Sequence, residues 1–322
     1  MCTVFSVELS SSILSSLCDS DYSPRMHVPI LSLFSSPIDW CGRNSTRRRA
    51  RFIGCRSFTR ALKMAHSDVQ TSVAQHQKVI VPNKKGEQLV GILHDTGSAE
   101  VVILCHGFRS NKENDISVNI AKTLENEGIS AFRFDFSGNG ESEGSFQYGY
   151  YHGEADDLHA IIQYWRAAGR VISGILGHSK GGDVVLLYAS KYQDINFVIN
   201  VSGRYDLKKG IKERLGDEFM ERIEKEGYID VKNKKGKVDY QVTWESLKDR
   251  LNTDMHEACL LIDKECRVFT VHGSADEVIP VEDAFEFDKI IPNHKLHVVE
   301  GQLISNSVVR STKANLLPFV PQ

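Results

Sequence analysis

The chain has 322 residues, of which 41% are hydrophobic and 25% are charged, with 39 Lys and Arg against 42 Asp and Glu. These ordinary values exclude collagen, a coiled coil, wholesale disorder and a disulfide-dense scaffold. The net charge of -3 gives no global reason to expect nucleic acid, and no stretch approaches the roughly 20 apolar residues of a membrane-spanning helix.

Residues 1–66 differ in composition from the rest of the chain. They hold 13 serines and nine basic residues but only four acidic ones, which is typical of an organelle transit peptide and, in a plant, of a chloroplast protein. Two alternatives stay open: an extension without a role, with translation starting at Met64, and a nucleic-acid-binding arm built on Arg47–Arg51. No periodic apolar pattern is present, so we predict a disordered N-terminal extension and a chloroplast or cytoplasmic localisation.

From Gln77 onward, short apolar runs alternate with helical patterns. The runs predict strands at 77–82, 89–93, 101–105, 130–135, 172–176, 197–201 and 268–271, and one more that ends at 297–299. Helical spacing predicts helices at 116–127, 156–168 and 182–191. Strands that are apolar on both faces and alternate with helices predict an α/β fold over 77–301, with a doubly wound, mostly parallel sheet.

Residues 204–265 interrupt this alternation. They are dense in charge, as in Met220–Lys225, Lys232–Lys237 and Trp244–Arg250, and we predict helical and loop structure for them. A helical lid inserted over one edge of the sheet is one interpretation. A solvated helical connection is the alternative.

The segment Gly177-His178-Ser179-Lys180-Gly181 has the G-x-S-x-G pattern and stands between an apolar strand and a helix. A serine at the tip of such an elbow adopts a strained backbone, and the residues two before and two after it must be small. Ser179 would lie near a helix N-terminus, whose partial positive charge favours a developing anion. We predict Ser179 as a nucleophile. The alternative is a glycine-rich turn without chemistry.

A second motif, His106-Gly107-Phe108, follows an earlier apolar strand. An oxyanion hole needs two N–H donors that point to one place. We expect one backbone N–H from Lys180, directly after the nucleophile, and the other from Phe108, because Gly107 lets this loop approach closely. His106 itself is expected to order the loop.

The third motif, Val271–Pro280, ends a strand in a turn that carries Asp276. A carboxylate there would orient a catalytic imidazole and stabilise it when protonated. Glu277 is the alternative acid, and an ordinary turn without chemistry is the alternative interpretation. His272 precedes the acid and is expected to be structural.

The glycine-rich loop Ser137–Gly144 does not fit a dinucleotide site, because G-x-G-x-x-G would need a glycine where Glu143 stands. We predict a tight turn at a sheet edge. The sequence contains no Walker A or HExxH pattern, and the cysteines after residue 66 form no CxxC pair. We therefore expect no metal and no organic cofactor.

Together these motifs resemble the α/β-hydrolase superfamily, and more narrowly the serine aminopeptidase S33-type esterases and lipases, a group that includes cinnamoyl and feruloyl esterases. The matching elements are HGF at 106–108, RFDFSGNGESEG at 133–144, GHSKGG at 177–182, VHGSADEVIP at 271–280 and NHKLHVVEG at 293–301. The resemblance implies an eight-stranded sheet with a lid after strand six. It also implies a nucleophile, an acid and two oxyanion donors at Ser179, Asp276, Phe108 and Lys180.

The chain departs from this family after Gly301. The family continues E-G-x-x-H, which would place its catalytic histidine at position 304, where this sequence has Ile304, and no histidine follows His297. We therefore interpret 302–322 as an atypical tail, as expected from a splice isoform, a retained intron or a gene-model error. The histidines that would have to substitute are all expected to be poorly placed: His152, His159, His178, His294 and His297.

Two functions from different classes follow. In the first, the protein hydrolyses small-molecule carboxylic esters through an acyl-enzyme on Ser179, with no nucleic-acid partner and no membrane span. In the second, it is a catalytically inactive isoform or binding protein, because without a base the Ser179 hydroxyl is a weak nucleophile at neutral pH.

Overall fold

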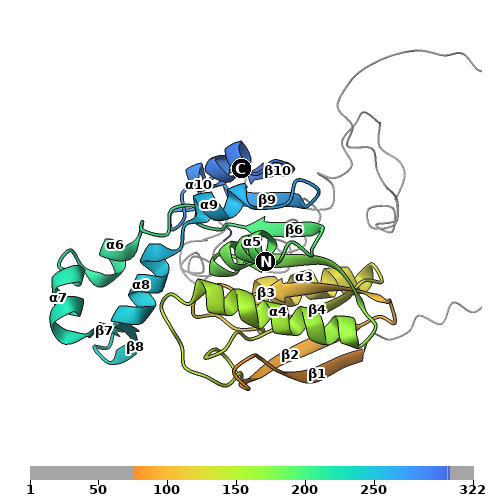
Figure 1. The fold of residues 1–322 in the computed structure, drawn as a ribbon, viewed down its shortest axis with the longest axis horizontal. Helices are drawn as coiled ribbons and strands as arrows, with labels where there is room; N and C mark the ends of the chain where they lie inside the picture. Colours follow the sequence, from red (N-terminus) through yellow and green to blue (C-terminus); the bar gives the residue numbers. More distant parts are fainter. Residues whose placement is uncertain (1–74, 303, 305–322) are drawn as a thin grey trace, which may run out of the picture.

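The computed structural model describes residues 75–302 and residue 304, and Figure 1 shows them in colour. The predicted extension over 1–66 lies outside the described residues. So does the predicted tail over 302–322, apart from Gln302 and Ile304.

A single eight-stranded sheet forms the centre of the molecule, in the order β1-β2-β4-β3-β5-β6-β9-β10 (Figure 1). β1 and β2 pair antiparallel, β2 pairs antiparallel with β4, and every other neighbouring pair is parallel. The predicted α/β fold with a mostly parallel sheet is confirmed. The strands are β1 Gln75–Pro82, β2 Gln88–Asp95, β3 Glu100–Cys105, β4 Ser130–Phe134, β5 Val171–His178, β6 Phe197–Val201, β9 Arg267–Gly273 and β10 His294–Val299.

Helices cover both faces of the sheet. Buried side chains of α4, α5, α9 and α10 pack on one face, whereas α3 packs on the other. These helices are α3 Asp115–Asn126, α4 Tyr151–Ala167, α5 Lys180–Tyr192, α9 Met255–Leu260 and α10 Glu282–Ile290. Among the described residues, no helix is both long enough and apolar enough to cross a membrane.

Strand β3 shows why the sheet needs both layers. Val101, Ile103 and Cys105 belong to the larger core cluster, and Val102 and Leu104 belong to the smaller one on the opposite face. Successive side chains of a strand point to opposite faces. A run that is apolar at every position is therefore satisfied only when both faces are covered.

The segment between β6 and β9 differs from the prediction of helix and loop alone. It contains helices α6 Ile211–Leu215, α7 Phe219–Glu226 and α8 Trp244–Asn252, but also an antiparallel hairpin of β7 Tyr228–Lys232 and β8 Val238–Thr243. Figure 1 shows these five elements grouped beyond one end of the sheet. The hairpin strands carry alternating apolar residues such as Ile229 and Val242, which are buried. The alternation was missed in the sequence because charged residues surround and interrupt it.

Helix α4 begins at Tyr151, five residues before the predicted start at Asp156. Gly153 weakens the helical pattern in this first turn. The turn forms nevertheless because Tyr151, Glu154 and Ala155 are buried. Tertiary packing therefore overrides the local preference.

The glycine-rich loop after β4 is a tight turn, as predicted, but it follows an internal strand. Gly138 donates a backbone hydrogen bond to Glu143 O at 2.8 Å. Gly140 has φ of +53°, and a Cβ on it would lie 2.2 Å from Asp135 Oδ2. Asp135 is fully buried and accepts hydrogen bonds from Lys112 Nζ and from the Glu141 backbone N–H. This loop is therefore built around a buried carboxylate.

Candidate active site

Ser179 stands alone between β5 and α5, at the carboxyl edge of the sheet. Its backbone has φ 55° and ψ -123°, a region that residues other than glycine rarely adopt. Its N–H donates to Val201 O at 2.8 Å, and its carbonyl accepts from Gly182 N at 2.8 Å. The strained residue is thus held by β6 on one side and by the first turn of α5 on the other.

Steric contacts with neighbouring backbone require glycine at both 177 and 181. A Cβ on Gly177 would lie 1.9 Å from Gly181 O, and a Cβ on Gly181 would lie 2.6 Å from the carbonyl oxygens of Cys105 and His106. Both contacts are with backbone, which cannot move aside as the end of a side chain can. The elbow and the end of β3 therefore pack together without room for a methyl group.

The loop after β3 reaches the same place. A Cβ on Gly107 would lie 3.1 Å from Ser179 Cβ, so this loop lies against the elbow. The backbone N–H groups of Phe108 and Lys180 form no hydrogen bond with the described residues. Lys180 is the first residue of α5, where an N–H has no partner within the helix. Two N–H donors with free capacity therefore belong to the segments that meet at Ser179, and their role as an oxyanion hole stays a prediction.

The Lys180 side chain turns into the protein. Its Nζ donates to Glu154 Oε1 at 2.6 Å and also to Gly149 O, and it lies 4.9 Å from the centre of the Tyr151 ring. Burial raises the pKa of Glu154 to about 7, although the Lys180 ammonium counteracts this rise. This ion pair holds Lys180 at the start of α5, and it therefore also positions the Lys180 backbone N–H next to Ser179.

Asp276 follows β9 and is 6% exposed. Its Oδ1 accepts hydrogen bonds from the backbone N–H groups of Val278 and Ile279, each at 2.9 Å. Its Oδ2 is buried and has no hydrogen-bond partner among the described residues. A buried acceptor without a partner is rare and costly, and this oxygen is the one that remains to accept an imidazole N–H. Glu277, the alternative acid, is exposed.

Position 304, where the family's histidine is expected, holds a buried isoleucine. The Ile304 side chain is 5% exposed and belongs to the core cluster on the α3 face. Its carbonyl accepts a hydrogen bond from His178 Nε2 at 2.5 Å. Burial lowers the pKa of His178, and the Ile304 carbonyl opposes that effect. The Nε2 atom of His178 is therefore occupied by a backbone carbonyl.

The other histidines that the sequence raised as substitutes lie on α4 and β10. His294 begins β10, at the amino end of that strand, and contacts Thr270 Oγ1 and Asp288 Oδ1. His159 stacks on the Tyr192 ring with 4.0 Å between centroids. His152 is an exposed residue of α4, and His297 lies within β10. No described residue accepts a hydrogen bond from Ser179 Oγ.

His106 and His272 have structural hydrogen bonds, as expected. His106 is 3% exposed, donates from Nδ1 to Gly107 O at 2.9 Å and accepts at Nε2 from Phe136 N at 3.2 Å. Burial lowers the pKa of His106 to about 4, so the ring is neutral at pH 7. His272 donates from Nε2 to Ile279 O at 2.8 Å.

A pocket of about 790 Å³ opens above Ser179. Its wall includes the two predicted oxyanion donors Phe108 and Lys180, residues of α6 and α8, and the segment 277–280 after Asp276. This volume lies within the range of roughly 300–1,000 Å³ that is usual for small-molecule sites. The sequence reasoning missed most of this wall, because it treated 204–265 only as a possible cover and assigned it no site residue.

The β7–β8 hairpin also contacts the loop after β3 that carries Phe108. The Phe108 ring packs edge to face on Tyr240 of β8, with centroids 5.8 Å apart, and on Tyr148 at 5.7 Å. The next residue, Arg109, forms an ion pair with Asp239. The loop that carries one predicted oxyanion donor is thus supported by a strand more than 100 residues later in the chain.

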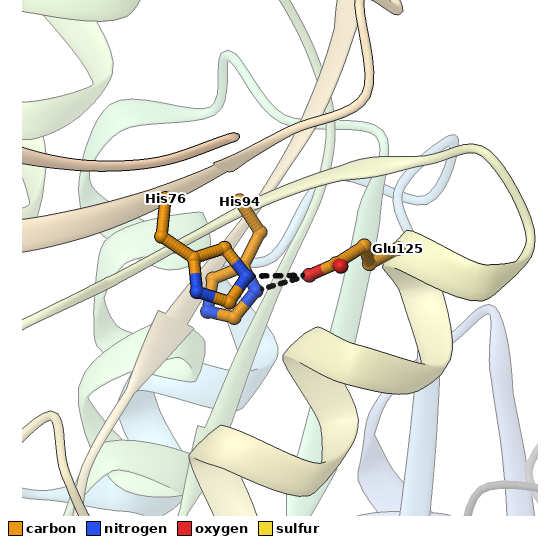
Figure 2. Close-up of side chains that lie close together, drawn as sticks. All are labelled: His76, His94 and Glu125. Atoms are coloured by element: carbon orange, nitrogen blue, oxygen red, sulfur yellow. Dashed lines mark hydrogen bonds and ion pairs between the residues drawn. The ribbon is translucent and has the colours of Figure 1, made fainter. Parts of the chain in front are cut away.

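One group of side chains away from the pocket has the composition of a metal site. Figure 2 shows His76, His94 and Glu125 converging, with Glu125 Oε2 lying 2.8 Å from His76 Nε2 and 2.6 Å from His94 Nδ1. Arg133 Nε, which can only donate, lies 3.0 Å from His94 Nε2. His94 therefore accepts at Nε2 and carries its proton on Nδ1, so the nitrogen that faces Glu125 is a donor. The hydrogen bonds explain this cluster without a metal ion.

The three cysteines among the described residues do not have the environment of reactive thiols. Cys105, Cys259 and Cys266 are free and buried. Burial raises the pKa of each thiol, so none has the thiolate character of a reactive cysteine.

Residues 97–255 match the family model described as serine aminopeptidase, S33. A search of curated protein sequences found no match. The matched range includes both predicted oxyanion donors and Ser179, and it ends before Asp276.

Solved structures show the same fold. Est1E from Butyrivibrio proteoclasticus with bound ferulic acid aligns with a TM-score of 0.61 and 23% identity, over 73% of this chain and 96% of that one. The α/β hydrolase GrgF from Penicillium sp. sh18 aligns with a TM-score of 0.62 and 18% identity, over 74% and 94%. The Pyrococcus furiosus esterase Pf2001 aligns with a TM-score of 0.55 and 20% identity, over 74% and 88%.

Proposed function

We propose that this chain, whose residues 97–255 match the serine aminopeptidase S33 model and whose fold is that of solved α/β hydrolases, hydrolyses small-molecule carboxylic esters with Ser179 as nucleophile. The observation that carries the proposal is the strained Ser179 at the elbow, flanked by the free N–H groups of Phe108 and Lys180. The pocket above it has room for a small or aromatic acyl group.

In the first step, Ser179 Oγ attacks the ester carbonyl carbon and the C=O π electrons move to the oxygen. The N–H groups of Phe108 and Lys180 bind this oxyanion, and each such donor is worth about 10²–10³ in rate in other hydrolases. The C–O bond to the alcohol then breaks, and the alcohol leaves with a proton. Water attacks the resulting acyl-enzyme in the same way, which releases the acid and restores Ser179.

The first step needs a base that accepts the hydroxyl proton of Ser179. Among the described residues, neither Ser179 Oγ nor Asp276 Oδ2 has a hydrogen-bond partner, so no described imidazole connects them. Loss of a triad member costs about 10⁴–10⁶ in kcat in other serine hydrolases, with residual catalysis from the oxyanion hole. We therefore expect slow turnover that rises when imidazole is added, because a free imidazole can donate to Asp276 Oδ2 and accept from Ser179 Oγ.

The test is hydrolysis of p-nitrophenyl butyrate by the wild-type chain and by Ser179→Ala, each with and without added imidazole. Ser173→Ala is the matched control, because Ser173 lies half-buried on β5, the strand that ends directly before Ser179. Imidazole itself hydrolyses p-nitrophenyl esters, so the rate without protein is subtracted at each imidazole concentration. We then expect wild type and Ser173→Ala to turn over the ester and to respond to imidazole, and Ser179→Ala to do neither. Labelling by a fluorophosphonate reports the nucleophilicity of Ser179 independently of deacylation.

The alternative, a protein that binds a small molecule without turnover, is separated by the same experiment. If the wild type and Ser179→Ala have equal rates at every imidazole concentration and neither is labelled, the esterase proposal is wrong.

A further inference from the structure

The pocket above Ser179 has more cationic than anionic side chains in its wall. Lys180 is neutralised by Glu154, but six other cations line the pocket: Arg204, Lys208, Lys209, Lys212, Arg214 and Arg250. None of the six forms an ion pair with a carboxylate among the residues that the structure describes. The chain as a whole has a net charge of -3, so this positive lining is a local feature.

Three carboxyl groups share the pocket wall, against the six cations that form no ion pair. Glu213 and Glu277 are exposed. Asp183 is buried and accepts a hydrogen bond from the Arg204 backbone N–H. Burial raises the pKa of its carboxyl well above the usual range, and the nearby Arg204 and Arg250 guanidiniums oppose that rise. Cations therefore exceed anions around the place where a substrate would lie.

Among these six cations, Arg250 gives the strongest indication of a ligand, because its charge is buried. It is 7% exposed, and its hydrogen bonds go to neutral acceptors: Leu207 O at 2.8 Å, Lys209 O at 3.2 Å and Tyr151 Oη at 3.2 Å. A guanidinium has five N–H donors, so donors remain. A buried charge is normally compensated by an opposite charge. Asp183 interacts electrostatically with Arg250 but forms no ion pair with it, so the free N–H groups of Arg250 can pair with an anionic ligand in the pocket.

Arg204 approaches the same pocket from the loop after β6. It is half-buried, and its guanidinium donates to Val278 O. Backbone carbonyls from different segments therefore hold both arginines in place. Side chains that are already ordered lose little entropy when an anion binds to them.

We propose that the substrate of this site is an ester that carries a second, anionic group of the carboxylate or phosphate type, which binds Arg250 and Arg204 while the ester carbonyl lies at Ser179. This inference rests on the proposed esterase function for the reaction, but the binding of the anion does not depend on turnover. Arginine binds both oxyanions through paired, charge-assisted hydrogen bonds.

The binding test uses phenyl phosphate and phenylacetate as anionic probes and benzyl alcohol as the neutral one, titrated calorimetrically at constant ionic strength. We expect the wild type to bind one or both anions at least about tenfold more tightly than the alcohol. Arg250→Gln and Arg204→Gln should each weaken anion binding by about tenfold to a hundredfold. The two anions distinguish a phosphate-type site from a carboxylate-type site.

Lys237→Gln is the matched control, since Lys237 is an exposed cation near the β7–β8 turn and does not line the pocket. It should bind the anions like the wild type. If Arg250→Gln fails to fold, Arg204→Gln carries the test alone. Equal binding of anions and alcohol, or unchanged binding in Arg204→Gln, would overturn the proposal.

The kinetic test compares p-nitrophenyl hydrogen glutarate with the neutral p-nitrophenyl pentanoate, both with imidazole present. We expect kcat/KM to favour the anionic ester at least about tenfold, and the preference to disappear in Arg204→Gln. An equal kcat/KM for both esters would overturn the proposal. Absence of turnover on both would refute the esterase function, and the calorimetric result would then decide the anion site.

Discussion

Lys180 Nζ lies 2.6 Å from Glu154 Oε1, and the two side chains are only 5% and 6% exposed. This buried ion pair is adjacent in sequence to the proposed nucleophile Ser179. The burial of Glu154 favours its neutral form and raises its pKa to about 7, and Lys180 opposes this shift. The titration of Glu154 therefore links the stability of the site to pH near neutrality.

The first prediction concerns this titration. The folded-state pKa of Glu154 lies above its unfolded value of 4.5, so the folded chain keeps a proton that the unfolded chain releases. The stability from this group is fully present below pH 4.5 and is lost as the pH rises through about 7. Relative to Glu154→Gln, the wild type should lose about 3 kcal/mol of unfolding free energy between these limits.

Urea unfolding of the wild type and Glu154→Gln at pH 5, 6, 7 and 8 measures this difference. Glu127→Gln is the control, because Glu127 is exposed. A difference between wild type and Glu154→Gln that stays constant over this pH range would contradict the prediction.

The second prediction concerns the elbow. Gly177→Ala places a methyl group 1.9 Å from Gly181 O, whereas Gly174→Ala on the same strand places one 3.1 Å from the Phe197 ring. Backbone cannot give way as an aromatic side chain can. Gly177→Ala should therefore destabilise the fold by about 1–3 kcal/mol or more and abolish fluorophosphonate labelling of Ser179. Gly174→Ala should cost less and keep the labelling. Thermal unfolding and labelling of both variants measure this, and equal effects would exclude the steric explanation.

The third prediction separates the two oxygens of Asp276. Asp276→Asn keeps an acceptor for the N–H groups of Val278 and Ile279, so its stability should be close to that of the wild type. Asp276→Ala leaves the part-buried Val278 N–H and the buried Ile279 N–H without their acceptor and should cost about 1–3 kcal/mol. Both variants should lose the stimulation of ester hydrolysis by imidazole, because neither presents a carboxylate to an imidazolium. Stimulation that survives in Asp276→Asn would show that Asp276 does not orient the base.

The fourth prediction concerns the His76–His94–Glu125 cluster. A metal on His94 Nδ1 would move the proton to Nε2, which Arg133 Nε–H occupies at 3.0 Å. Zn²⁺ should therefore leave the Tm unchanged, and EDTA should have no effect. In Arg133→Met the conflict is removed, so zinc binding by this variant alone would agree with the argument. A zinc-dependent rise in the Tm of the wild type would refute it.

The sequence was sufficient for the sheet and for the elbow. Runs such as Val101–Cys105 are apolar at every position, which only a strand covered on both faces can satisfy. Gly177 and Gly181 are separated from Ser179 by the spacing that steric contact demands. These features depend on local pattern, and local pattern is what a sequence displays.

The missed features depend on contacts between distant segments. The early start of α4 at Tyr151 requires burial against α5 and α8, and Gly153 argues against it locally. The alternating strands of the β7–β8 hairpin lie within a charge-dense segment. The cationic pocket joins Arg204 to Arg250 across 46 positions of the chain, and nothing in the spacing of these residues indicates that they meet.

The packing of Phe108 on Tyr240 limits how far the molecule can be trimmed. One proposed oxyanion donor is braced by a strand that is inserted between β6 and β9, and the neighbouring Arg109 is tied to Asp239 of the same strand. A minimal domain that bridges β6 directly to β9 would keep the complete sheet and the elbow. It would nevertheless leave the 106–109 loop without its lateral support, so engineering for a smaller catalyst must retain the hairpin.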